Sequence, residues 1–264
     1  MNSTMDLIKS RRSVRAFEDR PISPELKSEL LDAILRSPTA GNMMLYSVID
    51  VTDPEKKKAL SQSCDEQPFI ARAPLVLVFL ADFQRWMDYF AFSGALQQGG
   101  PTPRESDLLL AFSDALIAAQ TAVLAAESHG LGSCYIGDIM ERYEYHRDLL
   151  GLPPYAFPAT MLVIGYPTAQ QRTRTLTERL DRRYVVYENR YRSLERGELA
   201  ALYGNAGDDR HSTAGDGAPA APETAQDPAQ PSTNYGQQIY RRKFAADYSA
   251  EMRRSVALAL ENWR

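Results

Sequence analysis

The sequence DLLLAFSDALIAAQTAVLAAESHGL, residues 107–131, is the longest helical segment that the chain predicts. Its apolar side chains fall on all sides of a helix, and such a helix must be buried nearly all round. Asp114, Gln120 and Glu127 interrupt the apolar run, so we do not expect it to span a membrane. Its many alanines permit close contact between helices. The segment could therefore be the spine of a domain, a dimer seam, or both.

Shorter helices and strands alternate on either side of this segment. Leu75–Leu80 is an uninterrupted apolar run, which predicts a central strand covered on both faces. Phe83–Phe92 is rich in aromatic residues, and its rings either line a pocket or pack against the core. The pattern predicts helices over 4–10, 24–36, 55–63, 83–92 and 140–150 and strands over 46–52, 75–80, 133–137 and 159–167. This alternation indicates an α/β or α+β fold but does not reveal the order of the strands.

Composition limits the function classes open to the chain. Its 264 residues, 44% of them hydrophobic, can form one large domain with a full core. The net charge of −4 argues against nucleic acid as a partner, because such a binder carries a basic surface. Two cysteines, Cys64 and Cys134, are too few for a disulfide framework or a structural zinc site. We therefore expect a cytoplasmic protein without a metal, a secretory signal or a membrane partner.

The C-terminal third changes character. Residues 204–234 contain no leucine, isoleucine, valine, methionine or aromatic residue, so this segment cannot bury enough apolar surface to fold. We predict a main domain over 1–203, a flexible linker over 204–234 and a helical extension over 235–264. The extension ends in an amphipathic helix, which would pack on its own domain or on a partner subunit.

Cationic side chains near the N-terminus could bind an anion. Arg11, Arg12, Ser13 and Arg15 lie within five residues, and a guanidinium donates bidentately to a phosphate. The alternative is a solvated basic turn. Two further arginines follow directly after the last predicted strand, where loops commonly face ligands: Arg172 and Arg174.

The motifs in this order resemble those of the FMN-dependent nitroreductase superfamily, and most closely its oxygen-insensitive nitroreductases and NADPH-flavin oxidoreductases. The resemblance rests on RRSVRAF (11–17), PTAGNM (38–43), Gln67, GLGSCYIG (130–137) and GYP (165–167) with the arginines that follow. It covers nearly everything from residue 5 to about 203. It implies an α+β fold, a three-layer α/β/α sandwich with a mixed sheet and a long central helix. It further implies an intertwined homodimer with two FMN sites at its interface.

The resemblance also assigns roles to the matching positions. It implies that the FMN phosphate is bound by Arg11, Ser13, Arg172 and Arg174, with Arg12 beside them. It places Arg15 near N1 and O2 of the isoalloxazine and Gln67 at the polar edge of the ring. Thr39 and Asn42 would border the ribityl chain or the ring. An N–H close to the flavin N5 would come from the backbone of Tyr135, Ile136, Gly137 and Asp138.

Flavin chemistry agrees with these assignments. Negative charge gathers near N1 on reduction, so a fixed cation there raises the reduction potential, and no catalytic protein group is required. We accordingly expect the three histidines to be structural or exposed, with His146 in a surface helix and His211 in the linker. Cys134 is expected to be a small buried residue. Asp138 departs from the family pattern, which often has glycine there.

These features predict an FMN-containing NAD(P)H oxidoreductase that reduces nitroaromatics, quinones or free flavin by ping-pong two-electron transfer. NADPH or NADH would be a transient donor, and residues 241–243 could recognise the 2′-phosphate of NADPH or be a solvated patch. One alternative is a flavin-binding protein without turnover, acting as a store or regulator. Another is a member of the superfamily that resembles reductive dehalogenases.

Overall fold

A computed structural model of the chain describes residues 3–96, 100–204 and 234–264. The chain divides into two compact units, unit 1 (Met1–Arg174 with Glu251–Arg264) and unit 2 (Thr175–Ala250). The predicted linker over 204–234 lies, apart from its two end residues, outside the described residues. The division into a domain, a linker and an extension therefore stays a prediction.

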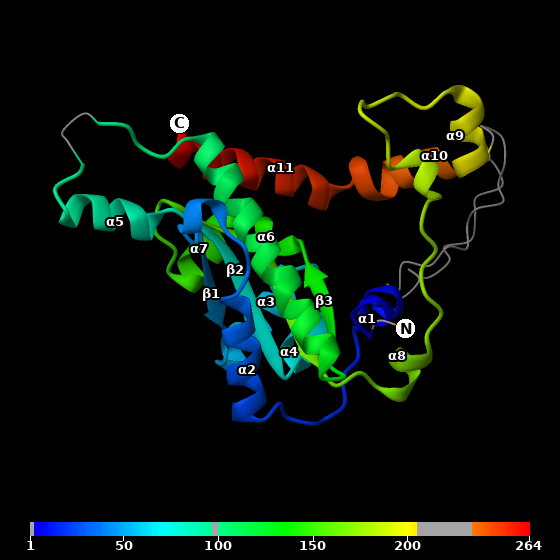
Figure 1. Ribbon diagram of the computed structural model, residues 1–264, viewed down its shortest axis with the longest axis horizontal. Coiled ribbons are helices and arrows are strands. Elements are labelled where there is room, and N and C mark those ends of the chain that lie inside the picture. The colour runs from blue at the N-terminus through cyan, green and yellow to red at the C-terminus, as the bar shows by residue number, and fades with distance from the viewer. Residues whose placement is uncertain (1–2, 97–99, 205–233) are drawn as a thin grey trace. The chain divides into compact units, whose positions relative to one another are not determined.

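Unit 1 contains the central helix and the sheet (Figure 1). Its strands are β1 (Tyr46–Asp50), β2 (Leu75–Asp82), β3 (Gly132–Ile136) and β4 (Ala156–Gly165). Its α-helices are α1 (Ser3–Ser10), α2 (Pro24–Ile34), α3 (Pro54–Ser63), α4 (Pro68–Arg72), α5 (Gln84–Phe92), α6 (Glu105–Ser128), α7 (Tyr143–Leu150) and α8 (Ala169–Thr173). Short 3-10 turns are η1 (Ala40–Asn42), η2 (Asp138–Met140) and η5 (Leu260–Trp263), and η5 follows α11 (Asp247–Ala259).

Unit 2 is built of short elements. They are η3 (Arg182–Tyr184), α9 (Arg196–Tyr203), α10 (Tyr235–Ile239), the π-helical turn η4 (Tyr240–Phe244) and the first residues of α11. The predicted helices and strands of unit 1 are confirmed to within a few residues at each end. The pattern missed α4 and α8, because a single helical turn has no room for a hydrophobic period.

The sheet has the strand order β1-β2-β4-β3, and each of its pairings is antiparallel. Leu77 pairs with Leu162, and Cys134 pairs with Val163. The predicted mixed sheet is therefore wrong for the described residues of this chain, in which the one parallel pairing is an isolated bridge between Ser13 and Ser133 outside the named strands. The α+β fold with its long central helix is confirmed.

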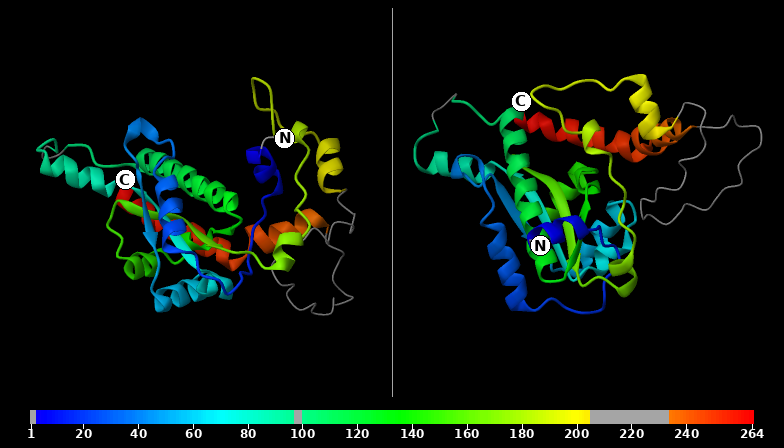
Figure 2. Two further views of the ribbon diagram at one scale, coloured as in Figure 1. Left: turned by 60° about the horizontal axis from the view of Figure 1, so that its bottom comes forward. Right: turned by 45° about the vertical axis from the view of Figure 1, so that its right-hand side comes forward.

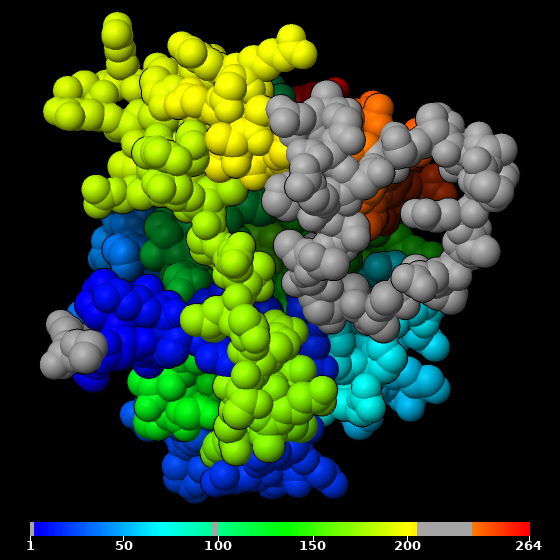
Figure 3. All heavy atoms as spheres, turned by 90° about the vertical axis from the view of Figure 1, so that its right-hand side faces the viewer, coloured from blue at the N-terminus to red at the C-terminus, as the bar shows by residue number. Residues whose placement is uncertain are grey.

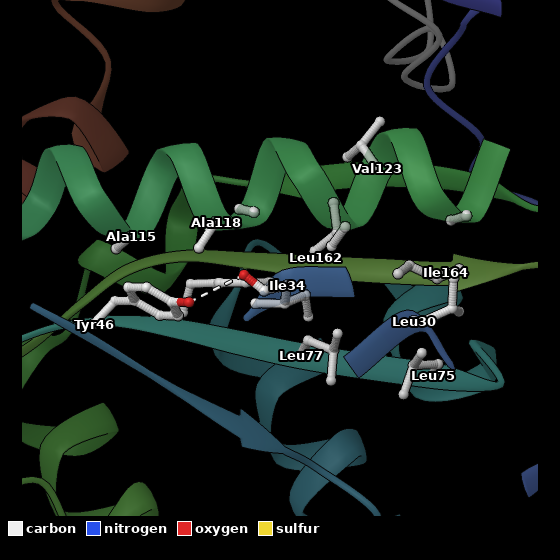
Figure 4. Close-up of a cluster of buried hydrophobic side chains, with 14 of the residues drawn as sticks. Leu30, Ile34, Tyr46, Leu75, Leu77, Ala115, Ala118, Val123, Leu162 and Ile164 are labelled. Atoms are coloured by element: carbon white, nitrogen blue, oxygen red, sulfur yellow. Dashed lines mark hydrogen bonds between the residues drawn. The ribbon is translucent and has the colours of Figure 1, made fainter. Parts of the chain in front are cut away.

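Helices cover both faces of the sheet. Alternate side chains of β2 point to opposite faces, and each set packs in a core cluster of its own. Leu75, Leu77 and Phe79 pack with α2 and α6 in one core cluster. Figure 4 shows Ala115, Ala118 and Val123 of α6 above the sheet, with the Tyr46 hydroxyl donating to the Ile34 carbonyl at 3.0 Å. Val76, Val78 and Leu80 pack on the other face against α3 and α4. The two views of Figure 2 show these layers from other sides.

The central helix α6 is open along one side. Its alanines at 111, 115, 118, 119, 122 and 126 are fully buried. Leu109 is 68% exposed, however, and Leu110, Leu116 and Ile117 are also exposed. The expectation that this helix is buried nearly all round is therefore wrong for the single chain. Of the described helices, α6 alone is long and apolar enough to cross a membrane, but its alanine face packs on the sheet.

The aromatic helix α5 was expected either to line a pocket or to pack against the core. None of its residues is fully buried, although Trp86 packs partly against the core. Phe83, Met87 and Phe90 also line a cavity of about 430 Å³, so the segment combines the two interpretations: Phe83 and Trp86 pack against the core, and part of the helix borders a pocket. Phe92 points into solvent and is 89% exposed.

Buried polar groups fix the surroundings of α6. The carboxylate of Asp114, which is 3% exposed, accepts from the Thr39 hydroxyl and from the N–H groups of Ala40 and Leu45 at 3.0 and 3.1 Å. This side chain thereby holds the loop that precedes β1. At the C-terminus, Trp263 is fully buried and meets Tyr155 edge to face.

We expect Asp114→Ala to lower the free energy of unfolding by about 2–4 kcal/mol, because it leaves buried donors without an acceptor. Asp32 is an exposed aspartate on α2, and Asp32→Ala should change the same quantity by less than about 0.5 kcal/mol. Urea titration of both variants measures the difference. Equal stabilities of the two variants would contradict the role of Asp114.

Candidate functional site

The N-terminal segment crosses the ends of β3 and β4. The N–H of Val14 donates to the Ser133 carbonyl, and that of Glu18 donates to the Tyr166 carbonyl, each at 2.8 Å. Two glycines permit this approach. A Cβ on Gly132 would lie 2.5 Å from Cγ2 of Val14, and one on Gly165 would lie 2.8 Å from the Phe17 ring. Any larger residue at these positions would push the segment away.

This crossing brings the two arginine groups together. Nη1 of Arg12 donates to the carbonyl oxygens of Arg172 and Arg174, at 2.5 and 2.6 Å, across 160 residues of sequence. Nη2 of Arg174 donates in return to the Ser13 carbonyl at 3.0 Å. The predicted meeting of these two segments is therefore observed, and Figure 3 shows the N-terminal residues (blue) directly beside the segment around α8 (yellow-green).

The arginines differ in what they bind. The guanidinium of Arg12 donates to the backbone carbonyls of Arg172 and Arg174 and so holds the loop that carries them. Arg172 pairs with Glu18 at 2.6 Å, and both side chains are about half exposed or less. Among the described residues, the guanidinium of Arg11 makes no hydrogen bond or ion pair. Arg15 lies against the Cys134 thiol, whose pKa is raised by burial and lowered again by this arginine.

A cavity of about 300 Å³ adjoins the arginines. Its walls include Arg12, Glu127, Gly132, Gln171 and Arg172. Glu127 is the one carboxylate among the cavity's lining residues, and burial raises its pKa while Arg11 and Arg12 oppose that rise. The local surplus of guanidiniums over carboxylates suits a phosphate group, because an arginine retains its charge at any working pH. The side chains present thus fit the phosphate of FMN.

Gln67 and Asp138 meet beyond the arginines. Gln67 caps α4, and its Nε2 donates to the Cys64 carbonyl at 2.9 Å and to Oδ2 of Asp138 at 2.7 Å. Tyr135, Ile136, Gly137 and Asp138 run from the end of β3 into η2, with Gly137 exposed. Polar groups of the predicted isoalloxazine site therefore lie together at the end of one strand.

Carboxylates surround this second part of the site. Burial, and then the nearby charges of Asp138 and Asp65, raise the pKa of Glu141 to about 7. Oε1 of Glu141 is buried without a hydrogen-bond partner in the described part of the chain. Burial, followed by the charge of Asp138, raises the pKa of Cys64 to about 12, so this thiol stays protonated.

The predicted ribityl-binding residues lie on the loop before β1. The Thr39 hydroxyl donates to Asp114 and accepts from the Met44 N–H at 2.9 Å, so its single donor is already used. Asn42 is exposed with a left-handed φ of 58°, a conformation that asparagine adopts more readily than most residues. Asn42 is thus exposed to a ligand, whereas the Thr39 hydroxyl has no further proton to donate.

His146 corrects one expectation. The sequence placed it on a surface helix, but it is fully buried beside α3. Its Nε2 lies 2.8 Å from the Ser63 hydroxyl and its Nδ1 lies 2.9 Å from the Ile139 carbonyl. Burial lowers its pKa, so the neutral ring ties α7 to η2. In the described ranges, no three histidine, cysteine or acidic side chains gather as a metal would require.

Comparison with known proteins gives consistent relatives. The model of the nitroreductase family matches residues 8–166. A Bacillus subtilis FMN reductase [NAD(P)H] is 36% identical over 171 residues, which are 63% of this chain and 67% of the relative. A Salmonella typhimurium oxygen-insensitive NADPH nitroreductase is 32% identical, over 76% of this chain and 79% of its own. The crystallised NADPH:FMN oxidoreductase of Vibrio harveyi, complexed with NAD+, superposes with a TM-score of 0.76 at 26% identity, over 98% of both chains.

The shifted Glu141 predicts a pH dependence of stability. Since its folded-state pKa of about 7 exceeds the ordinary value of 4.5, the folded protein binds this proton more tightly than the unfolded chain does. The free energy of unfolding that protonation of Glu141 contributes is fully present below pH 4.5 and is lost as the pH rises through 7. Glu141→Gln should therefore gain about 1–2 kcal/mol of stability relative to the wild type between pH 5 and pH 8. Urea titrations at both pH values measure it, and an unchanged difference would contradict the shift.

Proposed function

The chain belongs to the nitroreductase family and is an NAD(P)H-dependent FMN oxidoreductase, and we propose that it reduces nitroaromatics, quinones or free flavin by ping-pong two-electron transfer. The observation that carries the proposal is the contact between the two arginine groups, two members of which, Arg12 and Arg172, line an adjoining cavity. When bound, FMN supplies the hydride chemistry, and the protein supplies binding, orientation and charge.

The phosphate of FMN would be held by Arg11, Ser13, Arg172 and Arg174. Arg11 has an unused guanidinium among the described residues, and Arg174 is already fixed by its bond to the Ser13 carbonyl. Arg12 acts by anchoring the loop that carries Arg172 and Arg174. Arg172 would be shared between the phosphate and Glu18. This arrangement preorganises the cations, so that little side-chain entropy is lost on binding.

Arg15 would lie at the N1 and O2 edge of the ring, where its charge favours reduction. Gln67 would meet the polar edge of the ring. The backbone of Tyr135 to Asp138 would present an N–H to N5, and Thr39 and Asn42 would border the ribityl chain. Electron donor and electron acceptor would use the same open face in turn, which is what a ping-pong sequence requires. Residues 241–243 of unit 2 remain candidates for the 2′-phosphate of NADPH.

A homodimer is the second part of the proposal. The exposed stripe of α6, defined here as Leu109, Leu110, Leu116 and Ile117, is apolar, and α1 packs on the same helix with Met5 and Ile8 also exposed. A second copy of the chain would remove these side chains from water. The cytoplasm is the proposed compartment, since both cysteines are free and buried.

An anaerobic absorbance spectrum tests the function. Purified protein reconstituted with FMN should show a flavin band that NADPH or NADH bleaches and that a nitroaromatic or free flavin restores. A flavin band that neither donor bleaches would instead favour a flavin store or regulator. Protein that binds no FMN would contradict both functions.

The proposed roles of the arginines predict different losses. Changing Arg172 and Arg174 together to alanine should weaken FMN binding by about 10²–10³-fold, because two charge-assisted hydrogen bonds are lost. Arg15→Ala should change the FMN affinity by less than about tenfold but lower the flavin potential and slow reduction. Arg36→Ala removes an exposed charge outside the site and should leave both quantities unchanged. Fluorescence titration and spectroelectrochemistry measure them, and the reverse pattern would exchange the assigned roles.

The proposed dimer predicts the effect of a charge on the α6 stripe. Light scattering of the wild type should give twice the chain mass of 29.6 kDa. Ile117→Glu should shift the protein toward the monomer, because a carboxylate would have to be buried in an apolar seam. Gln62→Glu, on the exposed side of α3, should remain dimeric. A monomeric wild type would contradict the dimer.

A further inference from the structure

Gln67 is fixed by hydrogen bonds of both its backbone and its side chain. Its backbone N–H donates to the Ser61 carbonyl at 2.9 Å, and its own carbonyl accepts from the Ser61 hydroxyl at 2.9 Å. Its side chain is fixed as well, by the bonds from Nε2 to Cys64 and Asp138. The residue is thus constrained at both ends before any ligand arrives.

These bonds determine which way round the amide lies. Nε2 has two partners. The Cys64 carbonyl can accept a hydrogen bond but not donate one, and the same is true of the ionised carboxylate of Asp138. The reversed amide would place Oε1 against two acceptors, so the hydrogen-bond network excludes that orientation. Both amide hydrogens are consequently used within the protein. Toward a bound molecule, Gln67 offers only an acceptor, its Oε1.

The charge of Asp138 is felt by its surroundings. Asp138 is half-buried, at the point where η2 begins directly after β3. It contributes, after burial, to the raised pKa of both Cys64 and Glu141. A charged molecule that approaches the same side of the site meets the same negative field.

We propose that Asp138 sets the specificity of this enzyme for its electron acceptors, because its carboxylate disfavours anionic molecules, and that it also holds Gln67 so that Oε1 is the group offered to the bound flavin ring. The proposal rests on the proposed function of the site. It assigns Asp138 as a positioning and specificity residue, acting through Gln67 and through its charge. The favoured electron acceptors are neutral or cationic molecules, such as uncharged nitroaromatics.

A pair of matched probes tests this class. 4-Nitrobenzamide and 4-nitrobenzoate have nearly the same shape but differ in charge and in donor capacity. The wild type should prefer the amide in kcat/KM. Asp138→Asn removes the charge and keeps an acceptor for Gln67, so it should lower the KM for 4-nitrobenzoate about fivefold and leave that for 4-nitrobenzamide within about twofold. Asp138→Ala removes the same charge and one of the two acceptors of the Gln67 amide, so it should change the probe ratio as Asp138→Asn does and shift the flavin potential further.

The matched control is Asp65→Asn. Asp65 is an exposed carboxylate that acts on Glu141 as Asp138 does, and its left-handed φ of 58° suits asparagine. This variant has the same change in net charge, and it should leave the ratio of the two probes unchanged. An equal effect of Asp65→Asn and Asp138→Asn would overturn the specific role of Asp138.

A readout other than turnover separates this inference from the function itself. Asp138→Asn should raise the midpoint potential of bound FMN, because a negative charge beside the ring is removed, and Asp65→Asn should raise it less. If NAD(P)H bleaches the wild-type flavin but the Asp138 variants change neither the potential nor the probe ratio, the specificity role is wrong and the function stands. Equal midpoint potentials in the Asn and Ala variants would overturn the role of Asp138 in holding Gln67. A wild-type flavin that no donor bleaches overturns the function and the specificity together.

Discussion

The close passage of the N-terminal segment over the ends of β3 and β4 is the constraint on which the site depends. Gly132 and Gly165 leave space for Val14 and Phe17, and no other residue type would do so without displacing them. Hydrogen bonds between the backbones then fix the register of the segment. Only in that register can Arg12 reach the carbonyls of Arg172 and Arg174. The meeting of the two arginine groups thus depends on glycine at positions 132 and 165.

The charges of the site are separated along one strand. Arg11, Arg15 and Arg174 lie near the start and middle of β3, where their charges act on Cys134. Asp138 and Glu141 follow its end, where their charges act on each other and on Cys64. An oriented ligand with an anionic and a neutral end matches such a gradient, because each end meets the field that suits it. This separation fits a phosphate at one end and a ring at the other.

Periodicity and motif order predicted much of this molecule, and contacts across the fold supplied the rest. The apolar runs at Leu75–Leu80 and around residues 107–131 became β2 and α6, because burial on both faces leaves a clear pattern. The strand order and the antiparallel pairing leave no such trace in a single sequence. The burial of His146 depends on Ser63 and Ile139, which approach it only in the folded chain. The same holds for Arg12, which the resemblance placed beside the phosphate and whose guanidinium donates to carbonyls of the loop after β4.

Helix α6 shows why a sequence and a single chain can disagree. Its composition is apolar on every side, and that pattern satisfies the hydrophobic effect only if every side is covered. The sheet covers the alanine side, where small side chains allow close approach. Leu109, Leu110, Leu116 and Ile117 occupy the side that the single chain leaves in solvent. Large aliphatic side chains at these positions gain nothing from exposure, whereas each contributes on the order of 1.5–3 kcal/mol when fully buried. The all-round apolar pattern is therefore the signature of the proposed assembly rather than of the folded monomer.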